Sequence, residues 1–251
     1  MDGVSVRLEQ LKREAQKEWK RKWRKKLKQA APKTAADWRA LGLATLGAVL
    51  KVTLIILLPF AVLVRSAVFF YQHGGTPVWL AVFTAAILTC GVVTAYAVWV
   101  ARKLMRRGVR GTRALVMPLA KWVALPLVLF YCGYSLLYLA SVNAKSEPVR
   151  AYYGAVHPLL RLALSTAILA DRDVLITDTG RAPEDYGRMG LPVNSRTRHY
   201  KQADGWIHAV DLRTTGRGFM KTRGLQFYFW LMGFDTKRHV GTADHLHVEL
   251  N

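Results

Sequence analysis

The sequence predicts a membrane α-helical N-terminal half with three transmembrane helices, followed by a small extracytoplasmic α+β domain. Three observations predict this fold class. The 251-residue chain has 37 Lys and Arg against 16 Asp and Glu, a formal charge of +21, yet 52% of its residues are hydrophobic. Three apolar segments are long enough to cross a bilayer, and residues 145–251 contain none. This separation of charge from apolar sequence excludes both a disordered basic protein and an ordinary soluble domain.

The first 40 residues form a basic arm that we expect to be cytoplasmic. Residues 1–40 contain 13 Lys and Arg but five Asp and Glu. The stretch Leu8–Lys28 has helix-forming residues throughout, with Trp19, Trp23 and Leu27 at helical spacing. A basic helix with tryptophans on one side is typical of a segment lying on an anionic lipid surface. A solvated helix or a nucleic-acid-binding helix is the alternative, but the apolar segments that follow favour the membrane, and nucleic acid is not the expected partner.

The three predicted spans are residues 41–64, 76–101 and 114–142, within a membrane region at 41–143. The second has no charged residue until Arg102, and the third has only Lys121, which is near enough to an end to reach the interface. Lys51 lies deeper in the first span. It either reaches the interface beside a shielding helix or acts as a coupling charge that faces another helix.

The loops between these spans predict their orientation. Residues 102–113 contain six Lys and Arg and no acidic residue, whereas residues 65–75 contain one arginine. The positive-inside rule therefore keeps the arm and the 102–113 loop in the cytoplasm. Three crossings then place the C-terminal domain in the periplasm or outside the cell. We therefore expect a multi-pass protein of the bacterial cytoplasmic membrane, whose helices can bind other membrane proteins.

Residues 144–251 are long enough for an independent α+β domain. A helix is predicted from Arg150 to Ala170, with a break at Pro158 because proline cannot continue a helix. The two cysteines of the chain, Cys90 and Cys132, lie in apolar segments, which excludes a disulfide-rich scaffold and a cysteine-rich zinc site. The other expected elements are strands at Val174–Thr177, His208–Leu212 and His245–Leu250, turns over Asp178–Asn194 and an apolar element at Leu225–Phe234.

Five of the seven histidines lie between His199 and His247, a clustering that suggests metal chemistry. A catalytic zinc site has three protein ligands and an open position, and the sequence offers His199, Asp211 and His247 for it. In a strand, His245 and His247 share one face, so one can bind a metal while the other faces substrate. The same alternation turns His208 away from Asp211.

The stretch from Arg181 to the C-terminus resembles a family of zinc peptidases. It includes D-alanyl-D-alanine peptidases, phage L-alanyl-D-glutamate endolysins and the hedgehog signalling domain. Its pattern is an arginine after a strand, then S-x-H-x-x-G-x-A-x-D, then a closing D/E-x-x-H or H-x-H element. Here Arg181, Thr197 in place of serine, His199 and Asp211 match in order, and the run Asp244–His247 satisfies both closing forms. The resemblance covers about 70 of 251 residues.

The resemblance implies a hedgehog/DD-peptidase fold with a Zn²⁺ ion held by the three candidate ligands. It offers His245 as the general base, with Asp244 as runner-up, and Arg181 as the group that stabilises an oxyanion or holds a substrate carboxylate. The family's motif has fewer residues than the eleven between His199 and Asp211. We expect the extra residues to form a turn centred on Asp204-Gly205. If they do not, His208 replaces His199 as a ligand.

These inferences predict a membrane-anchored zinc peptidase that cleaves peptidoglycan stem or cross-link peptides, as a carboxypeptidase or an endopeptidase. A membrane anchor that keeps the peptidase fold and binds peptidoglycan without cutting it is the first alternative. A cytoplasmic-side lipid or nucleic-acid binder that acts through residues 1–40 is the second.

Overall fold

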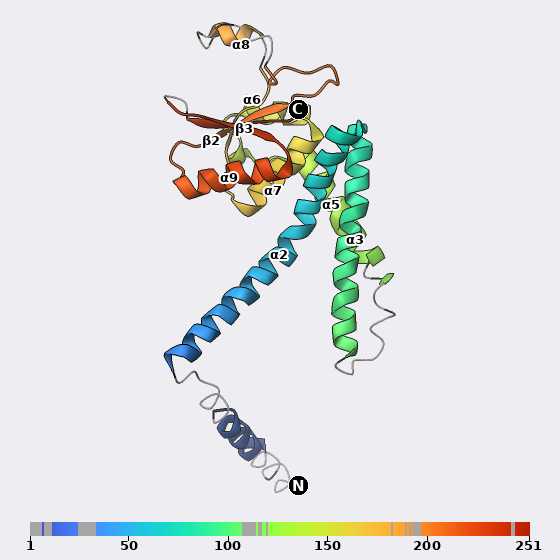
Figure 1. The fold of residues 1–251 in the computed structure, drawn as a ribbon, viewed down its shortest axis with the longest axis vertical. Helices are drawn as coiled ribbons and strands as arrows, with labels where there is room; N and C mark the ends of the chain where they lie inside the picture. The colour runs from blue at the N-terminus through green and yellow to red at the C-terminus, as the bar shows by residue number, and fades with distance from the viewer. Residues whose placement is uncertain are drawn as a thin grey trace. The chain divides into compact units, whose positions relative to one another are not determined.

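The computed structural model describes residues 7, 12–24, 34–106, 114, 117, 118, 120–181, 183–188, 190, 192, 197–241 and 244–251 (Figure 1). The chain divides into two compact units, Met1–Ile55 and Ile56–Asn251. The second unit contains the end of the first long helix, the second long helix and the C-terminal domain. Residues 25–33 and most of the 107–119 stretch, where parts of the arm, the basic loop and the third span were expected, lie outside the described residues.

The described residues of the first unit are helical, apart from Thr34. Residues 12–24 are an exposed helix in which the rings of Trp19 and Trp23 lie 5.8 Å apart, as their spacing predicts. The long helix α2 (Ala35–Gly74) begins at a reciprocal cap. The Thr34 hydroxyl accepts a hydrogen bond from the Asp37 amide, and the Asp37 carboxylate accepts one from the Thr34 amide.

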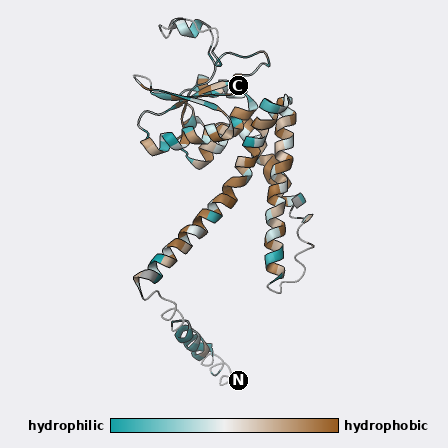
Figure 2. Ribbon diagram, in the orientation of Figure 1, coloured by the Kyte–Doolittle hydropathy of each residue, from teal (hydrophilic) through white to brown (hydrophobic). Residues whose placement is uncertain are grey.

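Two described helices are long and apolar enough to cross a membrane, α2 from Asp37 to Gly74 and α3 (Val78–Met105). Figure 2 shows that hydrophobic residues dominate both. The segment from Arg65 to Gly75, expected as a connection, is instead helical to Gly74, and Gly75–Pro77 makes the turn. The helix continues because its last turns are buried in protein, with Ala67 and Val68 fully covered. The third apolar helix, Lys121–Leu137, is shorter, so a third span stays a prediction.

The third apolar helix has two parts, η1 (Ala120–Ala124), which is a π-helix, and α5 (Leu125–Leu137). The chain then passes through short helices into the domain. These are η2 (Ser141–Asn143), α6 (Glu147–Ala151) and η3 (Tyr152–Ala155). The helix α7 (Pro158–Ala170) begins at Pro158, so the predicted break is confirmed.

The domain is built on one antiparallel sheet with strand order β1-β2-β4-β3. The strands are β1 (Ile176–Asp178), β2 (Ala209–Arg213), β3 (Asp235–His239) and β4 (His245–Glu249). The remaining helices are α8 (Pro183–Arg188) and α9 (Phe219–Met232). The strand β3 was not predicted, whereas the other three lie within two residues of their expected positions.

The hydrophobic core lies between one face of the sheet and the helices α7 and α9 (Figure 1). Leu246 and Val248 of β4 are fully buried there, in one cluster with Phe229 of α9. Alternation along β4 turns His245, His247 and Glu249 to the opposite face, which is open. The sheet therefore has an apolar face that the helices cover and a polar face that stays open.

Candidate metal centre

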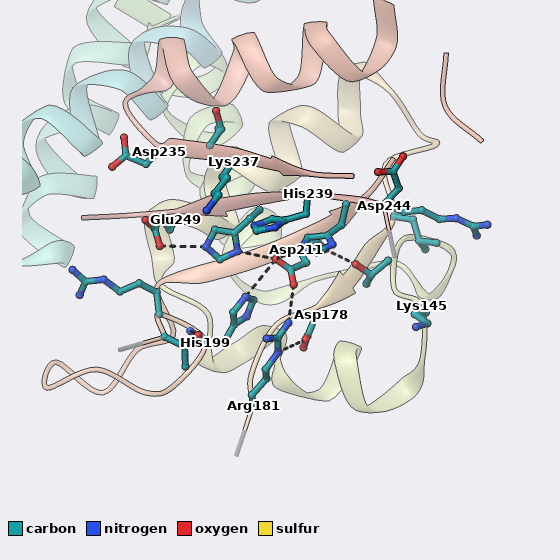
Figure 3. Close-up of a pocket in the computed structure, with 18 of the residues that line it drawn as sticks. Lys145, Asp178, Arg181, His199, Asp211, Asp235, Lys237, His239, Asp244 and Glu249 are labelled. Atoms are coloured by element: carbon teal, nitrogen blue, oxygen red, sulfur yellow. Dashed lines mark hydrogen bonds and ion pairs between the residues drawn. The ribbon is translucent and has the colours of Figure 1, made fainter. Parts of the chain in front are cut away.

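The structure brings the three predicted metal ligands together on the open face of the sheet. Asp211 lies in the middle of β2, His247 is its direct partner on β4, and His199 comes from the loop that precedes β2 (Figure 3). One nitrogen of each histidine and one oxygen of Asp211 all lie within 4.8 Å of one another. Asp211 and His199 are buried and His247 is partly buried.

Both imidazoles approach the same carboxylate oxygen. His247 Nδ1 lies 2.8 Å from Asp211 Oδ1, and His199 Nε2 lies 3.4 Å from it. Burial by itself would raise the pKa of Asp211, but the neighbouring His199 and His247 hold the pKa of this carboxyl well below its usual range. Asp211 is therefore ionised, as a metal ligand must be.

One nitrogen of His199 is held by the backbone, and the other faces the ligand cluster. His199 Nδ1 donates a hydrogen bond of 2.7 Å to the Thr179 carbonyl oxygen, which can only accept. In the neutral tautomer that matches this bond the lone pair is on Nε2, which lies 3.4 Å from Asp211 Oδ1. Among the described residues the buried His199 Nε2 has no hydrogen-bond partner. A buried acceptor left unpaired costs about 1–3 kcal/mol, and a metal ion between the three ligands would satisfy it.

His247 is held in the complementary orientation by Glu249. His247 Nε2 lies 3.2 Å from Glu249 Oε2, so its N–H donates to the carboxylate and Nδ1 is the nitrogen that faces Asp211. Burial would lower the pKa of His247, but Asp211 and Glu249 together raise it. A carboxylate behind a ligating imidazole is the usual second layer of a metal site.

Residues 201–207, between His199 and Asp211, form a hairpin with its turn where the sequence predicts it. Lys201 pairs with Ile207 across it, and the turn is closed at Asp204-Gly205. Gly205 has a φ of +83°, a conformation that glycine adopts without strain. His199 therefore keeps its place beside Asp211.

His208 points away from Asp211, as the strand alternation predicts. His208 Nδ1 lies 3.2 Å from the Leu250 carbonyl oxygen and Nε2 lies 2.8 Å from Asp204 Oδ2. His208 thus does not replace His199 in the ligand set.

His208 belongs to a second cluster, with His157 and Asp204, whose atoms also lie within 4.8 Å of one another. The His157 tautomer does not suit a metal. Its Nδ1 accepts a hydrogen bond from the Leu159 amide at the start of α7, so the proton is on Nε2, the nitrogen that faces Asp204. Burial, together with His208, lowers the pKa of His157 to about 3. Burial would raise the pKa of the Asp204 carboxyl, but the Trp206 amide and His208 lower this pKa overall. We interpret this cluster as packing around the Asp204 carboxylate, and not as a metal site. No sequence motif joins these residues, and the sequence did not predict it.

The predicted catalytic residues His245 and Asp244 also line this cleft. His245 Nε2 lies 3.8 Å from Asp211 Oδ1, next to the ligand cluster. Asp244 lies at the start of β4, where its Oδ2 is 3.4 Å from Arg238 Nη2. Asp244 Oδ1 is buried without a hydrogen-bond partner among the described residues.

Arg181 is engaged with two carboxylates. Its Nη2 lies 2.9 Å from Asp211 Oδ2, and its Nε lies 2.5 Å from Asp178 Oδ2. The arginine thus fixes the second oxygen of Asp211 and leaves Oδ1 to face the two histidines.

One further histidine in the cleft was not predicted as a site residue. The His239 ring of β3 stacks on His245, with centroids 4.7 Å apart and an interplanar angle of 15°. The strand β3 reads Asp-Thr-Lys-Arg-His, so its polar-only sequence gave no strand signal. Its pairing with β4 puts His239 directly opposite His245.

The cluster lies in a cleft of about 1010 Å³ that contains both signs of charge. Four histidines line it, and its basic and acidic side chains are Lys145, Arg181, Arg198, Arg213, Lys237, Asp178, Asp211, Asp235, Asp244 and Glu249. No protein-family model, curated protein or solved structure matches this chain. The functional assignment therefore rests on the geometry of this cleft.

Proposed function

We propose that the C-terminal domain is a zinc peptidase of the hedgehog/DD-peptidase type that cleaves peptidoglycan stem or cross-link peptides at the bacterial cytoplasmic membrane. The observation that carries the proposal is the convergence of His199 Nε2 and His247 Nδ1 on one oxygen of Asp211, in the cleft. Two imidazoles and one carboxylate are a ligand set of catalytic zinc sites.

Zinc fits these residues because each turns a ligand atom toward the same point. Asp211 is ionised, His199 donates from Nδ1 and so turns Nε2 to the cluster, and His247 donates from Nε2 to Glu249 and so turns Nδ1 to it. When bound, zinc lowers the pKa of a coordinated water to about 7 and polarises a substrate carbonyl.

The chain supplies a proton carrier beside this site. His245 is within 3.8 Å of the Asp211 oxygen and faces the cleft, so it is the candidate that takes a proton from water and passes it to the leaving amine. Asp244 is the second candidate, and its buried Oδ1 is available to orient a neighbouring group.

Arg181 has a role that differs from the one the resemblance implies. Because two of its nitrogens are bound to Asp178 and Asp211, we propose that it positions Asp211 as a ligand. A contact with substrate charge would fall to the remaining nitrogen.

The substrate class follows from the cleft and from the proposed location. A volume of about 1010 Å³ accommodates several peptide residues, and the mixed charges suit a peptide with both amino and carboxyl groups. A domain held outside the cytoplasm at a bacterial membrane meets such peptides in the cell wall. The arm formed by residues 1–40 would bind anionic lipid on the cytoplasmic side.

The test uses the full chain purified in detergent. We expect one zinc per chain by elemental mass spectrometry, and cleavage of purified stem and cross-linked peptides by mass spectrometry. His245→Ala should keep the zinc and slow cleavage by 10²–10⁴-fold, as loss of a positioned base does. His73→Ala, which removes a histidine far from the cleft in the sequence, is the matched control and should behave as the parent chain.

One observation favours the alternative of a peptidoglycan-binding anchor without activity. Asp211 has ionic partners in Arg181 and His247, so the chain itself compensates the charge of this carboxylate. A zinc-loaded chain that sediments with purified cell walls but cleaves no peptide across several wall types would replace the peptidase proposal with this one.

A further inference from the structure

The helix α9 has an uncovered apolar face. Its buried residues, Thr222, Leu225, Phe229 and Met232, recur every three to four positions and face the core. On the other side of the helix, Arg223 is the main polar residue. The exposed residues there are Phe219, Met220, Phe227, Trp230 and Leu231, with exposed fractions between 48% and 79%. We call these five residues the α9 face.

The size of the α9 face is unusual for a water-exposed surface. Five large apolar side chains at these exposures present on the order of 500 Å², near the largest apolar patch of a typical soluble monomer. The face also has the composition of a membrane-interface helix, with Trp and Phe beside a basic residue. Arg223 lies with its guanidinium carbon 5.5 Å from the Phe219 ring centroid, so its long side chain covers part of the face.

The α9 face is continuous with the apolar exterior of α2. Leu231 and Met232 line an apolar groove of about 570 Å³ together with Leu58, Val62 and Phe69 of α2. At Gly233, where α9 ends, an added Cβ would lie 3.0 Å from Val68. The Gln72 side chain also donates a hydrogen bond to the Gly233 carbonyl. The end of α9 is thus fixed against α2 within one compact unit.

The position of this contact along α2 indicates how deep α9 would lie relative to a bilayer. The uncharged run of α2 in this unit ends at Arg65, and the groove includes residues from Leu58 to Phe69. At 1.5 Å per residue the groove therefore extends along α2 about 10 Å from Arg65 toward the N-terminus and about 6 Å toward the C-terminus. A helix at this level lies where the hydrocarbon of a bilayer meets the headgroups if α2 crosses it.

We propose that the α9 face docks on the lipid bilayer, in which Phe227, Trp230 and Leu231 enter the interface and acyl chains occupy the groove beside α2. The inference rests on the proposed membrane anchoring by α2 and α3. Because α9 covers the core side of the sheet, this docking turns the cleft with His199, Asp211 and His247 away from the lipid. The cleft would then open toward polymer outside the membrane.

The test measures lipid contact at single labelled positions in the full chain. The chain carries Cys90→Ala and Cys132→Ala, and is reconstituted in vesicles of three parts phosphatidylcholine to one part phosphatidylglycerol. A fluorophore that responds to polarity is attached to one new cysteine at a time. The variants are Phe227→Cys and Trp230→Cys on the α9 face, Ile87→Cys on the exposed side of α3, and Lys237→Cys in the cleft.

We expect lipids with a nitroxide near the top of the acyl chain to quench the labels at positions 227, 230 and 87 at least twofold, and to leave the label at position 237 unchanged. Aqueous iodide should quench only the label at 237. If the label at 87 is quenched by lipid while those at 227 and 230 respond to iodide, α9 faces water and the docking proposal fails, although anchoring stands.

Two other outcomes also overturn the proposal. Labels at 227 and 230 that emit in an apolar environment without lipid quenching would show that protein, such as a second copy of the chain, covers the face. Absence of lipid quenching at position 87 would remove the membrane anchoring itself, and the docking proposal with it.

Discussion

Glu249 Oε2 lies 3.2 Å from His247 Nε2, two residues earlier on the same face of β4, and thereby sets which nitrogen of His247 is turned to Asp211. The carboxylate accepts a hydrogen bond from Nε2–H, and the ring then turns Nδ1 to the ligand cluster. Such a partner fixes the orientation of a ligating histidine and increases its basicity.

Replacing Glu249 should therefore weaken metal binding without removing a ligand. We expect Glu249→Gln to lower zinc affinity by roughly 10–100-fold, measured by competition with a chromophoric chelator. Asp235→Asn is the matched control, because Asp235 lies directly opposite Glu249 on β3 and also faces the cleft. An equal loss in both variants would mean that the general charge of the cleft, and not the contact with His247, supports the metal.

The three ligands should be individually necessary for zinc. We expect His199→Ala, Asp211→Asn and His247→Ala each to lose most of the bound zinc, because two remaining ligands rarely hold the ion. His208→Gln should keep it, since His208 faces Asp204 on the other side of the strand. Loss of zinc in His208→Gln with retention in His199→Ala would transfer the site to the second cluster.

The facing of the candidate ligands could be predicted because strand alternation is a local property. His245 and His247 face the cleft and Leu246 faces the core, as the alternation of a strand predicts. For the same reason Asp211 and His208 point to opposite sides of β2. The choice of ligand nitrogen could not be predicted, because it depends on the Thr179 carbonyl and on Glu249, which are contacts made by the tertiary fold.

The helix boundaries show a similar limit. The sequence predicts that the first span ends at Val64, just before Arg65, but Ala67 and Val68 are buried by the domain and the helix extends to Gly74. The strand β3 was missed because Asp235–His239 has no apolar residue, and its pairing with β4 alone makes it a strand. Periodicity predicts elements that bury a face, and not those formed through backbone pairing.

The Asp171–Arg217 ion pair should make stability depend on pH. Burial alone would raise the pKa of Asp171, but the Asp173 amide and Arg217, whose Nη2 lies 2.6 Å away, lower its pKa overall. Because the folded-state pKa is lowered, ionised Asp171 stabilises the fold at pH values above the ordinary carboxyl pKa of about 3.8. This stabilisation is lost as the pH falls through the folded-state pKa. Asp171→Asn should thus cost about 1 kcal/mol at pH 7.

The difference in melting temperature between Asp171→Asn and the parent chain should shrink below pH 4, because the parent carboxyl becomes protonated there. Asp185→Asn, which changes a carboxylate of the short helix α8, is the control. A difference that stays constant from pH 7 to pH 3 would show that shape, and not charge, accounts for the effect.

The number of membrane crossings depends on the helix Lys121–Leu137, and so does the side on which the cleft lies. At 1.5 Å per residue it is about 25 Å long, a few ångströms short of a typical hydrocarbon core. Short spans are tolerated when flanking residues reach the interface. Lys121 and Trp122 have that character, with the Lys121 ammonium 5.2 Å from the Trp122 ring centroid. We therefore expect this helix to cross.

Cysteine labelling in intact spheroplasts tests this crossing, in a chain without Cys90 and Cys132. Ser146→Cys should react with an impermeant maleimide, and Arg106→Cys should react only after the membrane is permeabilised; both positions are exposed. If both react only after permeabilisation, the helix does not cross and the cleft faces the cytoplasm. No peptidase in that location could meet the assembled cell wall, so this result would contradict the proposed substrate even if zinc were bound as expected.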